Sequence, residues 1–260
     1  MIGQILQQTG HRPWPLPSKP WVMVQSWHEL LFAHWPVAPA EIAYLLPPGL
    51  VVDTFAGDAW VGVVPFQMDR IRFRRIGGVP GATQFAEMNL RTYVRELHTN
   101  IPGVYFFSLD AANPVAVVVA RLRFHLPYYW AQMNVAESQA GWDYRSRRLY
   151  PDGGANFHAR YRSLADPAAT KKPRQISKAG SVEHFLTERY CLYTADRRGR
   201  ILRGDIHHTP WQLEPAEAEF LVNDLPQAHD IFLPDTPPLL HFSRELSVYI
   251  WPLIVCSTPR

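Results

Sequence analysis

Twenty-four prolines and 15 glycines are distributed along the 260 residues of this chain, and they limit the length of any helix. Proline lacks a backbone donor and clashes with the preceding helical turn, and glycine lowers helix stability. The composition therefore favours strands joined by turns. With 47% hydrophobic and 13% aromatic residues, the chain can also build a large core, which excludes disorder throughout its length.

Segments in which apolar and polar residues alternate predict the strands. The clearest is the segment EMNLRTYV, and the strand that contains it is expected over 87–95. Further strands are expected over 103–109, 129–137, 141–150, 155–163, 183–194, 200–208 and 239–251, with a hairpin over 50–68 around an Ala56-Gly57-Asp58 turn. Residues 21–37 also alternate like a strand, although Ser26 and Glu29 match a helical capping box.

Three short helices interrupt these strands. One begins near Pro39 and ends before Pro47, and another is expected over 214–224. Between them, Asn113 can cap a helix whose first turn holds Pro114. On that helix a common apolar face is formed by Val115, Val118, Val119 and Leu122. Asp110, before this helix, is expected to be a turn or capping residue.

The order of these elements does not alternate strand and helix, which argues against a doubly wound parallel sheet. An antiparallel barrel is the better solution because closure removes exposed strand edges. We therefore predict a mainly β protein, with an extended lead at 1–20 and a single barrel domain at 21–260 that encloses a cavity.

Charge and motifs exclude several classes of function. The net charge is only +3 and the basic residues are interleaved, so we expect no nucleic-acid partner. Two cysteines cannot form a four-thiolate site, and His207 and His208 point to opposite faces of a strand, so we expect no metal. There is no dinucleotide or phosphate-loop motif, and we expect no cofactor. Lacking a signal-peptide pattern and an 18-residue apolar stretch, the chain is predicted to be cytoplasmic, without a membrane partner.

The strand at 87–95 has one polar face. Glu87, Asn89, Arg91 and Tyr93 point one way, while the residues between them are mostly apolar. The polar face could look at solvent or into the barrel. Inside a barrel, Arg91 would favour the ionised Glu87 carboxylate while burial would oppose it. The two residues could orient a carboxylate or carbonyl ligand.

Five blocks of the chain resemble the YqjF-like family of uncharacterised bacterial proteins: SWHELLFAHWPV, LPPGLVVDTFAGDAWVGVVPF, EMNLRTYV, PGVYFFSLDAANPVAVVVAR and HLPYY. The resemblance extends from about Trp21 to His241. That family is related in fold to acetoacetate decarboxylase, which implies an antiparallel barrel around a buried site. It also implies that Glu87 matches a cavity-facing glutamate, and a homodimer is compatible with it.

Acetoacetate decarboxylases form a Schiff base on a lysine in a Pro-Lys-Lys segment. Here the similarly placed segment is LPYY, where Tyr128 and Tyr129 occupy the two lysine positions. A phenol cannot form an imine, and Lys171 and Lys172 lie in a hydrophilic loop some forty residues later. The resemblance therefore implies the scaffold without Schiff-base chemistry. The loop at 165–181 is expected to be solvated, with a lid over the barrel as the alternative.

Four residues near this segment complete the candidate site. His125 and Tyr128 join Glu87 as candidates for proton transfer, and Arg121 and Tyr129 join Asn89 and Arg91 as candidates for substrate binding. The alternatives are a solvated helix end for Arg121 and His125, and core aromatics for the two tyrosines. His28 and His34 are expected to be structural.

Three functions remain open from the sequence, and the weakest of them is a structural partner protein, which would show an exposed apolar patch and no cavity. The first is an enzyme, or former enzyme, that binds a small organic acid or carbonyl compound inside the barrel, with decarboxylation, isomerisation and hydration unresolved. The second is a non-catalytic module that binds a small apolar ligand. Convergent hydroxyl and carboxyl groups in the cavity would favour the first, and a purely apolar lining the second.

Overall fold

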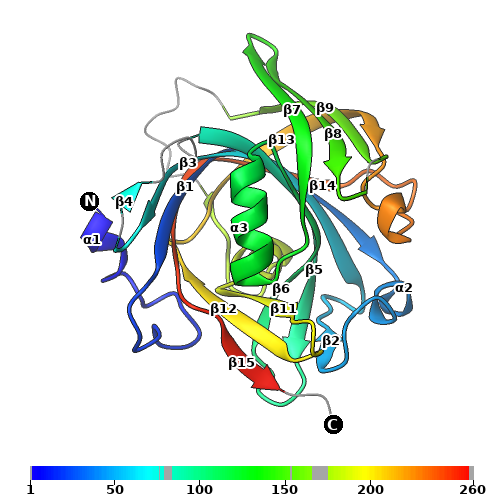
Figure 1. Cartoon of the computed structure of the whole chain (residues 1–260). Coiled ribbons are helices and arrows are strands. Elements are labelled where there is room, and N and C mark those ends of the chain that lie inside the picture. Colours follow the sequence, from blue (N-terminus) through cyan, green and yellow to red (C-terminus); the bar gives the residue numbers. More distant parts are fainter. Residues whose placement is uncertain (1, 76, 79–83, 153, 166–174, 258–260) are drawn as a thin grey trace.

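A computed structural model describes residues 2–75, 77–78, 84–152, 154–165 and 175–257, and its strands form one closed sheet (Figure 1). The strands are β1 (Met23–Val37), β2 (Leu50–Val52), β3 (Ala59–Phe73), β4 (Gly77–Gly78), β5 (Gln84–Glu96), β6 (Pro102–Ala111), β7 (Tyr128–Ser138), β8 (Gly141–Tyr150), β9 (Asn156–Ser163), β10 (Gln175–Ile176), β11 (Cys191–Ala195), β12 (Ile201–His207), β13 (Gln212–Asn223), β14 (Leu239–Ile250) and β15 (Ile254–Ser257). The helices are α1 (Ile2–Ile5), α2 (Pro39–Ala43), α3 (Pro114–Phe124), α4 (Val182–Thr187) and the 3₁₀ helix η1 (Gln227–His229). The predicted mainly β barrel is confirmed.

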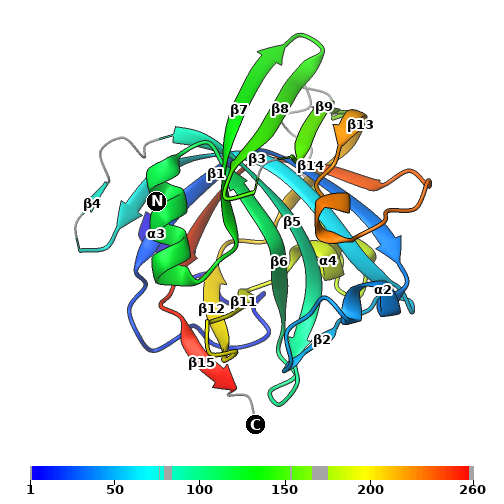
Figure 2. The same cartoon turned by 45° about the vertical axis from the view of Figure 1, so that its right-hand side comes forward.

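Two closed rings of strands share one wall. The wall consists of β14, β1, β3, β5 and β6. Strands β11 and β12 close it into a seven-stranded ring, and β7, β8, β9 and β13 close it into a nine-stranded ring. β6 belongs to both rings because Val104 and Tyr105 pair with β11, whereas Leu109 to Ala111 pair with β7. The β7–β8 hairpin projects beyond the rest of the barrel (Figure 2).

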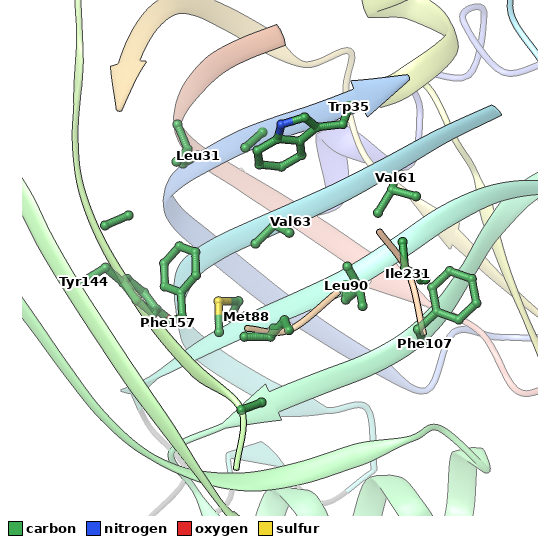
Figure 3. Close-up of a cluster of buried hydrophobic side chains, with 14 of the residues drawn as sticks. Leu31, Trp35, Val61, Val63, Met88, Leu90, Phe107, Tyr144, Phe157 and Ile231 are labelled. Carbon is green, nitrogen blue, oxygen red and sulfur yellow. The ribbon is translucent and has the colours of Figure 1, made fainter. Parts of the chain in front are cut away.

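A hydrophobic core fills the nine-stranded ring. In Figure 3, Val63, Met88 and Leu90 of the shared wall face Tyr144 and Phe157 from β8 and β9. Successive strand residues point to opposite faces, so the neighbouring residues of the wall enter the seven-stranded ring instead. That second side is lined by another apolar cluster, which includes Met23, Leu30, Val64, Phe66 and Val248.

Two predicted elements were wrong in type. The segment 214–224 belongs to strand β13 rather than to a helix, because Ala216, Ala218 and Phe220 pack on the core and the strand pairs with β9 and β14. These pairings outweigh the helix propensity of its alanines and glutamates. The predicted strand at 183–194 is instead α4 followed by β11, and Ser181 caps α4 by accepting a hydrogen bond from the His184 amide.

Three further expectations need correction. Asp110 is not a turn or cap but a fully buried residue of β6. The hairpin at 50–68 does not form, since β2 pairs with β5, although Phe55 and Asp58 bridge the predicted turn. On α3 the predicted apolar face does not pack into a core, because Val118 and Leu122 are exposed.

The N-terminal segment packs against the barrel. The predicted lead begins with the short helix α1, and Arg12 is buried against the barrel, where it donates to the Ile206 carbonyl oxygen. Most of the predicted lid, 166–174, lies outside the described residues. Within the described parts of the chain, no helix has the length and apolar character needed to cross a membrane.

Candidate functional site

The seven-stranded ring encloses a cavity of about 470 Å³. Every strand of the ring contributes to its lining, as does α3, which lies across the end of the ring in Figure 1. Most of the lining is apolar, including Trp27, Phe66 and Trp211. The ring itself is therefore not packed solid.

Strand β5 places the predicted polar face in this cavity. Glu87, Asn89 and Arg91 line it and are all buried, while Met88 and Leu90 enter the core of the nine-stranded ring. Of the two orientations left open by the sequence, the interior one is observed.

The Glu87 carboxyl group is bonded to a phenol. The Tyr128 hydroxyl donates to both Glu87 oxygens, at 3.1 and 3.0 Å. Burial raises the pKa of Glu87 to about 8, the Tyr128 hydrogen bond opposes this rise, and the charge of Asp110 adds to it. Burial and the neighbouring Glu87 charge also raise the pKa of Tyr128 well above its usual value. Around neutral pH the pair can therefore exchange a proton at Glu87 while Tyr128 keeps its own.

The position of Glu87 is held from the other side of the wall. The Tyr144 hydroxyl donates to the Glu87 backbone carbonyl oxygen at 2.8 Å. Tyr144 itself is fully buried among the core residues of Figure 3. The strand is thereby tied to β8 at the residue whose carboxyl group faces the cavity.

Arg91 is a buried cation without an ion-pair partner among the described residues. Its side chain is 9% exposed, lies over the Phe32 ring with its guanidinium carbon 5.3 Å from the centroid, and donates at most weakly to the Leu186 carbonyl oxygen, at 3.5 Å. Its Nε atom has no hydrogen-bond partner, and neither has the Oδ1 atom of Asn89. A buried charge with an unpartnered Nε donor is costly unless a ligand anion compensates it.

The lining also contains polar residues that the sequence pattern does not predict. Arg189 is buried and paired with Asp53, with 2.7 Å between its Nη1 and Oδ2 of Asp53. His208 lines the cavity, and both its ring nitrogens contact backbone carbonyl oxygens. Cys191 also lines it, but burial raises its pKa to about 12, so the thiol is not activated. No local motif could have revealed Arg189, because its partner is 136 positions away.

Three of the predicted site residues lie elsewhere. His125 is an exposed left-handed C-cap of α3, and Arg121 is exposed and donates to the Tyr128 carbonyl oxygen at 2.6 Å. Tyr129 points away from Tyr128, and the Arg148 guanidinium lies 3.8 Å from its ring centroid. Thus Glu87, Asn89, Arg91 and Tyr128 are brought together, and His125, Arg121 and Tyr129 are not.

Metal-ligating residues do not cluster within the described chain, where no group of three or more His, Cys, Asp or Glu side chains could hold an ion. His34 bonds the Tyr93 hydroxyl at 2.7 Å, and His28 bonds Asp69 at 2.6 Å. These two histidines have the structural contacts expected for them.

Comparison with known proteins identifies similar chains and folds. The model of the DUF2071 family, described as "uncharacterized conserved protein", matches residues 24–247. The uncharacterized protein YqjF of Bacillus subtilis (strain 168) is 44% identical over 238 residues, which are 92% of this chain and 94% of YqjF.

Solved structures of similar fold include the enduracididine biosynthesis enzyme MppR complexed with pyruvate, with a TM-score of 0.59 at 13% identity over 95% of this chain and 94% of MppR. They also include acetoacetate decarboxylase from Legionella pneumophila, with a TM-score of 0.57 at 11% identity over 95% of this chain and 92% of that one. The predicted acetoacetate decarboxylase-like fold is confirmed.

Proposed function

This chain belongs to the DUF2071 family, and we propose that it binds a small organic acid with a carbonyl group in the cavity and transfers a proton through Glu87. The observation that supports this most directly is the coexistence, in one cavity, of the unpaired Arg91 cation and the Glu87–Tyr128 pair. A carboxylate on Arg91 would form a charge-assisted hydrogen bond with its unpartnered Nε donor.

The spacing of the two charges suggests the shape of the ligand. Glu87 and Arg91 are four residues apart in one strand, so their Cα atoms are about 13 Å apart, with Asn89 between them. We infer that the carbonyl group lies several bonds from the carboxylate, where Asn89 can orient it and Glu87 can reach a neighbouring atom.

The chemistry at Glu87 is acid–base chemistry. A carboxyl group with a pKa of about 8 is mostly protonated at neutral pH, and it can donate and recover a proton with little energetic penalty. Decarboxylation, isomerisation and hydration all need such a group. Among the described residues of the lining there is no lysine, so the proposal does not involve an imine.

The mainly apolar lining supports a second candidate, a module that binds an apolar ligand without converting it. The two candidates differ in what Arg91 does. In the first, affinity depends on an anionic group of the ligand, and in the second it does not.

The test is calorimetric titration with oxo acids from pyruvate to 7-oxooctanoate, using the wild type and Arg91→Met. We expect the variant to lose roughly 10- to 100-fold in affinity for the acids, because a hydrogen bond to a charged group contributes about 1.5–3 kcal/mol. The neutral ketones of equal length should lose nothing.

Arg147→Met is the matched control, because Arg147 is an exposed residue of β8 outside the cavity. Equal affinity of the wild type and Arg91→Met for every acid would reject the first candidate. Tight binding of the neutral ketones by both proteins would favour the second.

A further inference from the structure

A second hollow lies on the surface at the C-terminal end of α3. This groove has a volume of about 350 Å³, and its lining includes Arg121, His125, Arg197, Tyr105 and Thr194. It contains two of the residues that the sequence suggested for the site but that do not reach the cavity.

The groove is cationic. Arg121, His125 and Arg197 line it, and no aspartate or glutamate belongs to its described lining. The nearest acid in sequence, Asp196, is paired with Arg200 at 2.7 Å and does not line the groove. Arg197 has no ion-pair partner among the described residues, so its charge is available to an anion.

Two side chains separate the groove from the cavity. Phe106 of β6 and Leu126 line both hollows. Leu126 follows the left-handed residue His125, whose carbonyl oxygen accepts a hydrogen bond from the Thr194 hydroxyl at 2.5 Å. Two residues later, Tyr128 reaches Glu87. A single short segment thus places the His125 imidazole in the groove, Leu126 in the partition and the Tyr128 phenol in the cavity.

We propose that this groove is the entrance for anionic substrates, where Arg197 and Arg121 attract the anion before it passes between Phe106 and Leu126 to Arg91. The proposal rests on the proposed function, since it supplies the route to the Arg91 cation. Cations around a narrow opening raise the local concentration of an anion and its association rate, and salt screens this effect. The groove therefore raises the association rate of the anion, whereas Arg91 raises the affinity of the cavity for it.

Two fluorescent probes with the same apolar body test this. One is 8-anilinonaphthalene-1-sulfonate, an anion, and the other is N-phenyl-1-naphthylamine, which lacks the sulfonate. Stopped-flow association is measured at low and high ionic strength for the wild type, Arg197→Glu and the control Arg198→Glu. Arg198 follows Arg197 in the same turn but does not line the groove. Arg121 is left unchanged because it bonds the Tyr128 carbonyl oxygen.

We expect Arg197→Glu to slow association of the sulfonate roughly three- to tenfold at low salt, and the difference should vanish at high salt. The neutral probe and the Arg198→Glu control should be unaffected. A further variant, Leu126→Ala, should speed both association and dissociation of both probes by widening the partition.

The outcomes separate the entrance from the proposed function. Equal association rates of the sulfonate with Arg197→Glu and Arg198→Glu would overturn the entrance alone. If Arg91→Met binds the sulfonate as tightly as the wild type does, the proposed function fails. Absence of sulfonate binding to the wild type would overturn both.

Discussion

Glu87 and Arg91 belong to the same buried face of β5, but the residues that contact each side chain differ and have different effects on its charge. Glu87 has a phenol as its hydrogen-bond donor and no cation paired with it among the described residues, so burial favours its neutral form. The Arg91 guanidinium group lies beside the rings of Phe32 and Tyr93 and has no ion-pair partner among the described residues. The cavity therefore combines a fixed cation with a titratable acid.

Replacement of Glu87 should change how stability depends on pH. The folded-state pKa of about 8 lies above the ordinary value of 4.5, so the folded protein keeps a proton that the unfolded chain releases. The resulting loss of unfolding free energy is absent below pH 4.5, grows as the pH rises to 8 and is complete above pH 8. Between pH 5 and pH 9 the wild type should lose on the order of 4 kcal/mol of unfolding free energy that Glu87→Gln keeps.

Denaturant unfolding of both proteins across this pH range measures the effect. Asp143→Asn is the control with the opposite sign, since hydrogen bonds from Arg145 lower the pKa of the half-buried Asp143. Identical pH dependence of the wild type and Glu87→Gln would show that Glu87 is ionised in the folded protein at neutral pH.

At the scale of elements, helix α3 matters most for the site. It begins where predicted, because the Asn113 side chain accepts hydrogen bonds from the Val115 and Ala116 amides, at 3.0 and 3.1 Å. Its residues Ala116 and Ala120 line the cavity, while Val118 and Leu122 face outward. The helix is thus a cover for the cavity rather than part of a core.

Removal of the cap should loosen this cover. We expect Asn113→Ala to lower the free energy of unfolding by about 1 kcal/mol and to speed hydrogen exchange of the α3 amides. Asn113→Asp keeps an acceptor at the same position and should remain close to the wild type. Equal exchange rates in the two variants would mean that the cap does not hold the helix.

At the scale of the whole molecule, the shared wall is connected to β8 by a buried ion pair. Asp110 of β6 accepts two hydrogen bonds from Arg148, at 3.0 and 2.8 Å, and both side chains are almost fully buried. Removing one member of such a pair leaves an uncompensated buried charge. The pair therefore joins β6 to β8, which lies two strands further along the nine-stranded ring.

Asp110→Ala should destabilise the protein by roughly 3–5 kcal/mol, as measured by denaturant unfolding. Because this variant could fail to fold, the double variant Asp110→Leu/Arg148→Met is measured with it and should recover most of the loss. The ion pairs of Asp143 with the exposed Arg145 and Arg160 provide the comparison, and Asp143→Ala should cost less than about 1 kcal/mol. Similar losses in Asp110→Ala and Asp143→Ala would contradict the assigned role.

Local pattern by itself determined most of the strands, the capped helix α3 and the set of residues that share the polar face of β5. These properties depend on the two-residue period of a strand and on contacts between near neighbours, so a short segment contains them. The LPYY segment likewise determined that Tyr128 and Tyr129 stand where the family resemblance implies two lysines.

Only the tertiary structure decided which faces are inside and which residues meet. Tyr128 reaches Glu87 and Tyr129 does not, because the pairing of β7 with β6 places Tyr128 beside Leu109 in the cavity lining. Arg189 meets Asp53 from 136 residues away, and β13 is a strand because distant partners pair with it. Such contacts arise when the sheet closes, and no local period or propensity encodes which strands will become neighbours.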